Sequence, residues 1–206
     1  MQPGSAWQWG DAEALDLHVA ELMKDIAGHW WMVVARGIAS FAFAGALLLV
    51  PDWSSVRALT VLFGIWALAD GGGALAFAFA VRGAPVAAYF GRGCLGIAVG
   101  ALALALPQPP TVMLYVLVSA WAIGTGALEM AFASRAWFVL PRAVGFMLVG
   151  LVTLGLGMSL PWFPLESAAT LRAFLVVFAV ANGVAATIMG EALHLPPRHA
   201  LPSRAT

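Results

Sequence analysis

The chain has 206 residues, of which 62% are hydrophobic and only 10% are charged, and its formal net charge is zero. A soluble domain has roughly a quarter of its residues charged, so lipid must solvate most of this chain. The sequence contains one cysteine, Cys94, and no basic cluster with interleaved aromatic residues. It therefore gives no indication of an internal disulfide, a Cys-based metal site or nucleic-acid binding. We expect Cys94 to pack in the interior, as free cysteines commonly do.

The first 29 residues are acidic and precede the apolar part of the chain. Hydrophobic residues recur at helical spacing between Gly10 and Gly28, with acidic residues between them. This pattern predicts an amphipathic helix. A cleavable signal peptide is not expected, because the segment is acidic and the first apolar run begins only at Trp30. Residues 1–29 are therefore interpreted as a cytoplasmic amphipathic segment.

Six apolar runs follow, and each is long enough to cross a bilayer, which takes roughly 20 residues. A proline-containing segment separates the two members of each pair of runs. Because proline ends helices, we interpret these segments as turns. The runs cover residues 30–50, 56–80, 88–106, 111–132, 138–160 and 169–190. We predict an all-α integral membrane protein. Residues 30–193 would form six transmembrane helices as three repeated hairpins, and residues 194–206 a flexible cytoplasmic tail.

Basic residues are unevenly distributed between the two predicted ends of this bundle. The end with the hairpin turns has only Arg57 and Arg172, and the end with both termini has the other eight. Because lysine and arginine favour the cytoplasmic side, we predict a multi-pass protein of the bacterial inner membrane with both termini in the cytoplasm. The eight residues are Lys24, Arg36, Arg82, Arg92, Arg135, Arg142, Arg198 and Arg204.

One pattern occurs three times, and it places charged or polar residues inside the predicted spans. Each copy has an Arg in its first helix and a polar residue followed by glycine in its second helix. Charge in hydrocarbon is costly, so these positions are the candidate site. In the second copy the polar residue before glycine is Thr125, and the acidic residue Glu129 follows one turn later. The candidate ion-pair or polar residues are Arg36 and Asp70 in the first copy, Arg92 and Glu129 in the second, and Arg142 and Asn182 in the third.

Chain distances from the turns predict which of these groups share a depth. Arg36 and Asp70 each lie 17 residues from Trp53 in the first turn, which at about 1.5 Å per residue places them at the same level. The same reasoning pairs Arg92 with Glu129 and Arg142 with Asn182. Either these groups form pairs that hold each hairpin together, or they form a polar cluster for a ligand or a proton.

Small and aromatic residues also recur. Gly96 and Gly100 form a Gly-x-x-x-Gly motif, which lets helices approach closely. We expect this contact within the chain, with a homo-oligomer contact as the alternative. Trp66 and Trp121 occupy equivalent positions in the first two copies, and we expect both in the core.

These repeated motifs resemble the HdeD-like acid-resistance membrane proteins over about residues 30–190. The resemblance implies a six-span bacterial inner-membrane protein linked to acid stress, without a known chemistry. The third copy has Ala143 where the other copies have glycine, and Thr125 and Asn182 replace the acidic residue of the first copy. The motifs are Trp30-Trp31, Arg36-Gly37, Gly45, Pro51 and Trp66-Ala67-Leu68-Ala69-Asp70-Gly71, then Arg92-Gly93, Gly100, Pro107 and Trp121-Ala122-Ile123-Gly124-Thr125-Gly126.

The sequence has no signature of a zinc protease, a serine hydrolase or a phosphate-binding loop. We therefore expect a protein that is not an enzyme and has no cofactor or metal. Its partners would be the lipid bilayer and possibly further copies of the chain, and any small ligand is unknown. The leading hypothesis is a contribution to acid or envelope stress tolerance. The alternative is a small transporter or channel whose polar site is formed by the intramembrane Arg and acidic residues.

Overall fold

The computed structural model describes residues 25–26, 28–49, 55–81, 86–106, 110–136, 143–162 and 167–194. Six long helices account for nearly all of this part, and all six are long and apolar enough to cross a membrane. The prediction of an all-α fold with six spans is thus confirmed. The helices are α2 (Trp30–Leu49), α3 (Val56–Ala80), α4 (Val86–Ala105), α5 (Thr111–Ala136), α6 (Ala143–Ser159) and α7 (Ala168–His194), with a short 3₁₀ turn η1 (Leu160–Trp162) after α6.

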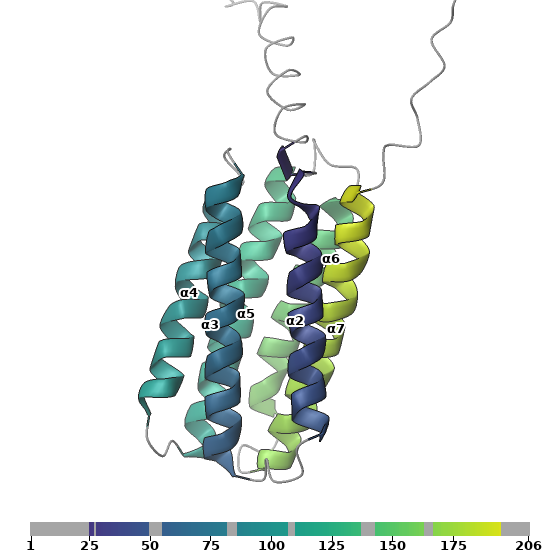
Figure 1. The fold of residues 1–206 in the computed structure, drawn as a ribbon. Coiled ribbons are helices and arrows are strands. Elements are labelled where there is room, and N and C mark those ends of the chain that lie inside the picture. The colour runs from purple at the N-terminus through teal and green to yellow at the C-terminus, as the bar shows by residue number, and fades with distance from the viewer. Residues whose placement is uncertain are drawn as a thin grey trace, which may run out of the picture.

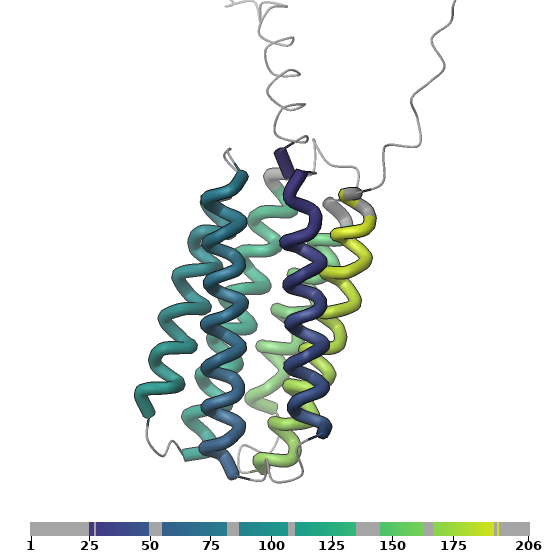
Figure 2. Tube along the Cα trace, viewed as in Figure 1, coloured from purple at the N-terminus to yellow at the C-terminus, as the bar shows by residue number. Residues whose placement is uncertain are grey.

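The helices stand side by side in one upright bundle (Figure 1). Successive helices run in opposite directions, so the bundle has two distinct ends (Figure 2). The turn end holds Leu49, Ala105 and Trp162, where the first helix of each hairpin finishes. The terminal end lies opposite and holds Trp30, where α2 begins, and His194, where α7 finishes. Apart from residues 25, 26 and 28, the predicted amphipathic helix lies outside the described residues, as do residues 195–206.

The closest helix packing is between successive copies of the repeat rather than within hairpins. The tightest partners are α3 with α4, α5 with α6, and α2 with α7. Glycine permits each approach. A Cβ added at Gly96 would lie 2.8 Å from the Cα of Gly71, and one at Gly126 would lie 2.8 Å from the carbonyl oxygen of Gly150. Because α7 returns to α2, the three copies close into a ring.

The Gly-x-x-x-Gly motif of α4 lies on this packing surface. A Cβ at Gly100 would lie 2.8 Å from the carbonyl oxygen of Gly64 on α3. The prediction that the motif serves packing within the chain is confirmed. The physical reason is the usual one for membrane helices, in which small residues allow two backbones to come close.

Two hydrophobic cores fill the interior. The turn-end core includes Phe43, Phe63, Trp66, Trp121 and Phe178. The terminal-end core is built around a second set of aromatic residues, Phe77, Tyr89, Phe132 and Phe146, and also contains Ile26 from before α2. Trp66 and Trp121 are buried as predicted.

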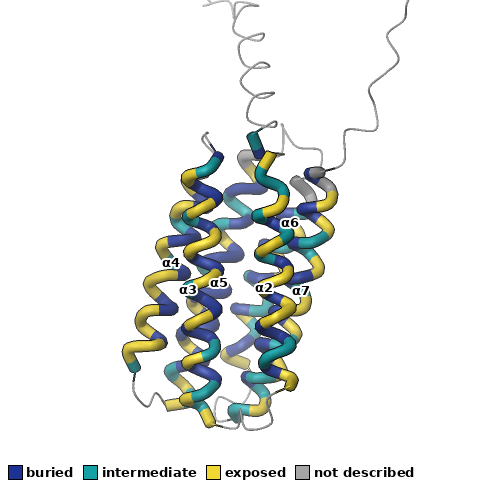
Figure 3. Tube along the Cα trace, viewed as in Figure 1, coloured by how far each residue is buried: buried dark blue, intermediate teal, exposed yellow. Residues whose placement is uncertain are grey.

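The outward helix faces are mostly exposed and apolar, whereas the inward faces are buried (Figure 3). Exposed Ile38, Phe79 and Leu148 are typical of this surface and suit contact with lipid hydrocarbon. Cys94 also lies on the exposed face of α4. The expectation that it packs in the interior is therefore wrong, because α4 turns its glycines, not Cys94, toward α3.

Candidate functional site

Five polar side chains from five helices meet between the two cores, and we call them the ion cluster. Each comes from a different helix, so only the assembled bundle brings them together. Four of them are almost completely buried, and the Arg36 side chain retains 17% exposure. The members are Arg36 on α2, Asp70 on α3, Arg92 on α4, Glu129 on α5 and Asn182 on α7.

Arg36 reaches three of the other members. Its Nε donates to Oδ1 of Asp70 at 2.8 Å. Its Nη2 donates to Oε1 of Glu129 at 2.9 Å and to Oδ1 of Asn182 at 3.2 Å. One guanidinium group therefore connects α2 to α3, α5 and α7.

Arg92 is more deeply buried and binds both acids. Its Nη2 donates to Oδ2 of Asp70 at 2.8 Å, and its Nη1 donates to Oε1 of Glu129. Each carboxylate thus bridges both arginines, and the two positive and two negative charges cancel. This matching matters because a charge left unpaired inside a low-dielectric interior is strongly destabilising.

The matching is incomplete at two atoms. Among the buried side-chain atoms of the described residues, Nε of Arg92 and Oε2 of Glu129 have no hydrogen-bond partner, and neither does Nε1 of Trp121. A buried polar atom without a partner carries a desolvation penalty that its neighbours do not offset. The Glu129 side of the cluster therefore retains an unused acceptor in the middle of the bundle.

The third copy contributes differently from what the sequence predicted. Arg142 lies outside the described residues, and Asn182 accepts its bond from Arg36 of the first copy. Arg36 and Arg92 each precede their turn proline by 15 residues, whereas Arg142 precedes Pro161 by 19. By proline spacing, the equivalent position is Phe146.

Phe146 is buried, and its ring centroid lies 5.0 Å from that of Phe132. In the third copy, the position equivalent to Arg36 and Arg92 is therefore occupied by Phe146, a residue of the terminal-end core. Two of the three pairs expected within hairpins are present, Arg36 with Asp70 and Arg92 with Glu129. The third, Arg142 with Asn182, involves a residue outside the described ranges. The sequence did not predict the additional bonds between copies. Asp70 and Asn182 both bind an Arg from a neighbouring copy.

Aromatic side chains pack together beside the ion cluster, on the side of the turn end. Trp66, Trp121 and Phe178 each lie four residues before the polar position of their copy, and they meet one another. Their ring centroids are 4.8 Å apart for Trp66–Trp121, 5.2 Å for Trp121–Phe178 and 5.9 Å for Trp66–Phe178. Edge-to-face pairs at such distances are favourable. Thr125, the polar residue of the second copy, bonds back to the carbonyl of Trp121 in its own helix.

Two cavities adjoin the ion cluster where the helices of a hairpin pack less closely. One of about 340 Å³ lies between α2 and α3 and is lined by Arg36, Asp70 and Tyr89, among others. The other, of about 430 Å³, lies between α6 and α7 and includes Asn182. The sequence analysis did not predict the two cavities or the position of Tyr89 beside one of them. Both depend on how separate helices pack, and the pattern of residues along a single helix does not reveal this.

The cluster is held together by ion pairs and charge-assisted hydrogen bonds. Within the described ranges, no group of three or more His, Cys, Asp or Glu side chains is placed to hold a metal ion. The two arginines bind carboxylates through several N–H groups at once, which fixes geometry as well as charge.

The fold and the cluster define a multi-pass membrane protein built from repeated helical hairpins that share one central set of ion pairs. The chain belongs to the family described as a short repeat of unknown function (DUF308), which matches residues 26–90 and 91–162. The first match covers α2, α3 and the first five residues of α4, and the second covers the rest of α4, then α5, α6 and η1. Neither the curated proteins nor the solved structures contain a match to this chain.

Proposed function

We propose that this chain is a non-enzymatic protein of the bacterial inner membrane, of the HdeD-like type, that contributes to tolerance of acid or envelope stress. The observation that supports it is the ion cluster, which is charge-matched and buried between two aromatic cores. The arginines and carboxylates bind one another, so the arrangement resembles a structural node more than a reacting site. The resemblance of the repeated motifs to the HdeD-like proteins supplies the link to acid stress.

The aromatic layer at the turn end suits such a role. In the proposed orientation the turn end faces outward, so protons from an acidic exterior would meet packed rings before any ion pair. Trp121 and Phe63 add a further edge contact at 6.0 Å in this layer. A membrane protein that works during acid stress has to avoid leaking protons, and a tightly packed apolar layer favours that behaviour.

The test of function is survival. Cells with and without the gene are compared after exposure to low pH, at several growth phases and cell densities. We expect the deletion to lower survival and the wild-type gene to restore it. Equal survival under all these conditions would count against the proposal.

Orientation is tested separately with reporter fusions. We expect cytoplasmic signals from fusions at the terminal end and external signals from fusions in the hairpin turns. A reversed result at the first link would contradict the hairpin topology. The fusion points are Ala84, Ala136 and Ala200 for the cytoplasm, and Asp52, Gln108 and Phe163 for the exterior.

The second candidate function is a small transporter or channel. The observation that favours it is the cavity between α2 and α3, which brings Arg36 and Asp70 to an open space. The unused acceptor of Glu129 adds a place where a proton or a ligand donor would bind. Flux through purified protein in liposomes with a pH or ion gradient tests this reading. Flux no greater than in empty vesicles would contradict the transporter or channel hypothesis.

A further inference from the structure

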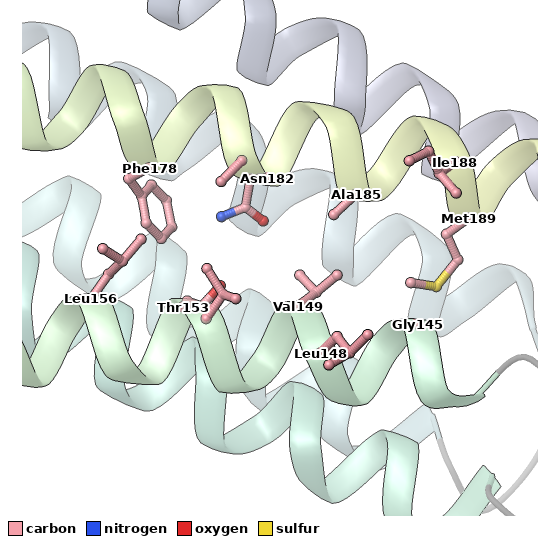
Figure 4. Close-up of a pocket in the computed structure, with 12 residues that line it drawn as sticks. Gly145, Leu148, Val149, Thr153, Leu156, Phe178, Asn182, Ala185, Ile188 and Met189 are labelled. Atoms are coloured by element: carbon pink, nitrogen blue, oxygen red, sulfur yellow. The ribbon is translucent and has the colours of Figure 1, made fainter.

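The cavity between α6 and α7 differs from a simple packing defect. Its volume is about 430 Å³, almost three times that of an engineered apolar cavity of roughly 150 Å³ that binds benzene. Figure 4 shows Val149, Thr153 and Leu156 of α6 facing Asn182 and Ala185 of α7 across the space. A molecule of appreciable size can therefore occupy it.

The cavity opens toward the lipid. Leu148, Val152 and Ile188 line it, and they are also 57%, 49% and 63% exposed on the outer surface of the bundle. Because the surface around them is apolar, the mouth of the cavity lies in the hydrocarbon of the bilayer rather than in water. An occupant would enter sideways from the membrane.

Two polar groups face this apolar space. Thr153 and Asn182 are 2% and 5% exposed, and the Asn182 amide points from α7 toward α6 (Figure 4). Arg36 occupies the amide oxygen of Asn182, which leaves the Nδ2 group as a donor. Thr153 lines the same cavity and adds its hydroxyl group to this apolar space. Hydrocarbon cannot satisfy such groups, so both favour an occupant that carries an acceptor.

Depth and charge narrow the class of occupant. Asn182 lies 14 residues after the start of α7 and 12 before its end, so it sits near the middle of the span. Phospholipid headgroups lie at the bilayer surface and do not reach that level. No charged residue lines this cavity, so an ionic group would be unpaired there.

We propose that the cavity between α6 and α7 binds an uncharged, membrane-dissolved amphiphile, a hydrocarbon carrying a hydroxyl or carbonyl oxygen. The oxygen accepts one hydrogen bond from Nδ2 of Asn182 and a second from the hydroxyl group of Thr153. The hydrocarbon part packs against Val149, Leu156 and Ala185. This binding site is separate from the proposed role in stress tolerance and does not depend on it.

The test uses hexadecan-1-ol with a diazirine in its chain as a photoreactive probe, added to the full-length protein in nanodiscs. Mass spectrometry locates the labelled peptides, and unlabelled hexadecan-1-ol or hexadecane competes for the site. We expect saturable labelling of α6 and α7 that the alcohol displaces and the alkane does not. The alcohol differs from the alkane only in the hydroxyl, so the comparison isolates the polar contact.

Three variants assign the site. Ala185→Phe fills the cavity and should abolish saturable labelling. Val184→Phe places the same ring on the exposed face of α7, outside the lining, and should label as the wild type does. Thr153→Val keeps the shape but removes the hydroxyl, so about fivefold more alcohol should be needed for displacement.

Each contrary result overturns the proposal. Absent saturable labelling means that no such amphiphile binds, and equal displacement by hexadecane means that the cavity holds only an acyl chain. Equal labelling of the two phenylalanine variants places the probe elsewhere. If Ala185→Phe fails to fold, the Thr153→Val variant tests the proposal instead. An unchanged displacement curve for the alcohol would show that the Thr153 hydroxyl does not contribute to recognition, which contradicts the proposal.

Discussion

Replacing Arg36 and Asp70 by leucine, singly and together, measures how strongly the ion cluster couples α2 to α3. Arg36→Leu leaves two buried carboxylates with Arg92 alone, and Asp70→Leu leaves two arginines with Glu129 alone. Either variant therefore leaves one net charge in the interior. The double variant leaves Arg92 and Glu129, whose charges cancel.

The structure sets the expected magnitude. The Asp70 side chain is 3% exposed, so its removal should cost the full penalty of an unpaired buried charge, about 3–5 kcal/mol. The Arg36 side chain is 17% exposed beside a cavity, so its removal should cost somewhat less. Because the double variant restores neutrality, we expect its loss to be smaller than the sum of the two single losses by about 2–3 kcal/mol.

The assay is equilibrium unfolding in mixed micelles of mild detergent and SDS, followed by helicity. Arg57→Leu is the matched control, since Arg57 is exposed near the start of α3, away from the cluster. It should cost less than about 0.5 kcal/mol and add to Asp70→Leu without coupling. If the Arg36 and Asp70 losses are also additive, the two groups do not interact. If all three cluster variants fold normally but survival or flux is lost, the cluster is functional, and the transporter reading gains.

Two further stability predictions use the same assay. Gly96→Ala should destabilise the bundle by roughly 1–3 kcal/mol, because the new Cβ would lie 2.8 Å from the Cα of Gly71 on α3. Gly72→Ala meets open space and should be neutral or stabilising by up to about 1 kcal/mol, so equal losses would refute the packing argument. Arg172→Leu removes the bonds from the guanidinium to the carbonyls of Leu47 (2.7 Å) and Leu48 (3.2 Å), which join α7 to the end of α2. We expect a loss of about 1–3 kcal/mol, and a loss no larger than that of Arg57→Leu would show that this contact does not help close the ring.

Local features of the sequence determined the spans and the depth of the polar groups. Apolar run length and turn prolines define six helices because both act within one segment of chain. Depth follows equally directly, since each helical residue advances by a fixed rise. Counting from the first turn placed Arg36 level with Asp70, and the structure has them in contact at 2.8 Å. A count from the prolines would also have identified Phe146 as the equivalent of Arg36.

Only the tertiary structure decided which helices are neighbours. Hairpin connections suggested partners within each copy, yet Gly71, Gly126 and Gly183 bring successive copies closest together. As a result, Asp70 binds Arg92 as well as Arg36. Asn182 on α7 accepts a hydrogen bond from Arg36 on the neighbouring helix α2. A turn fixes the order of two helices but not how tightly they pack. That choice depends on matching small and large side chains over whole helix surfaces, which no single segment contains.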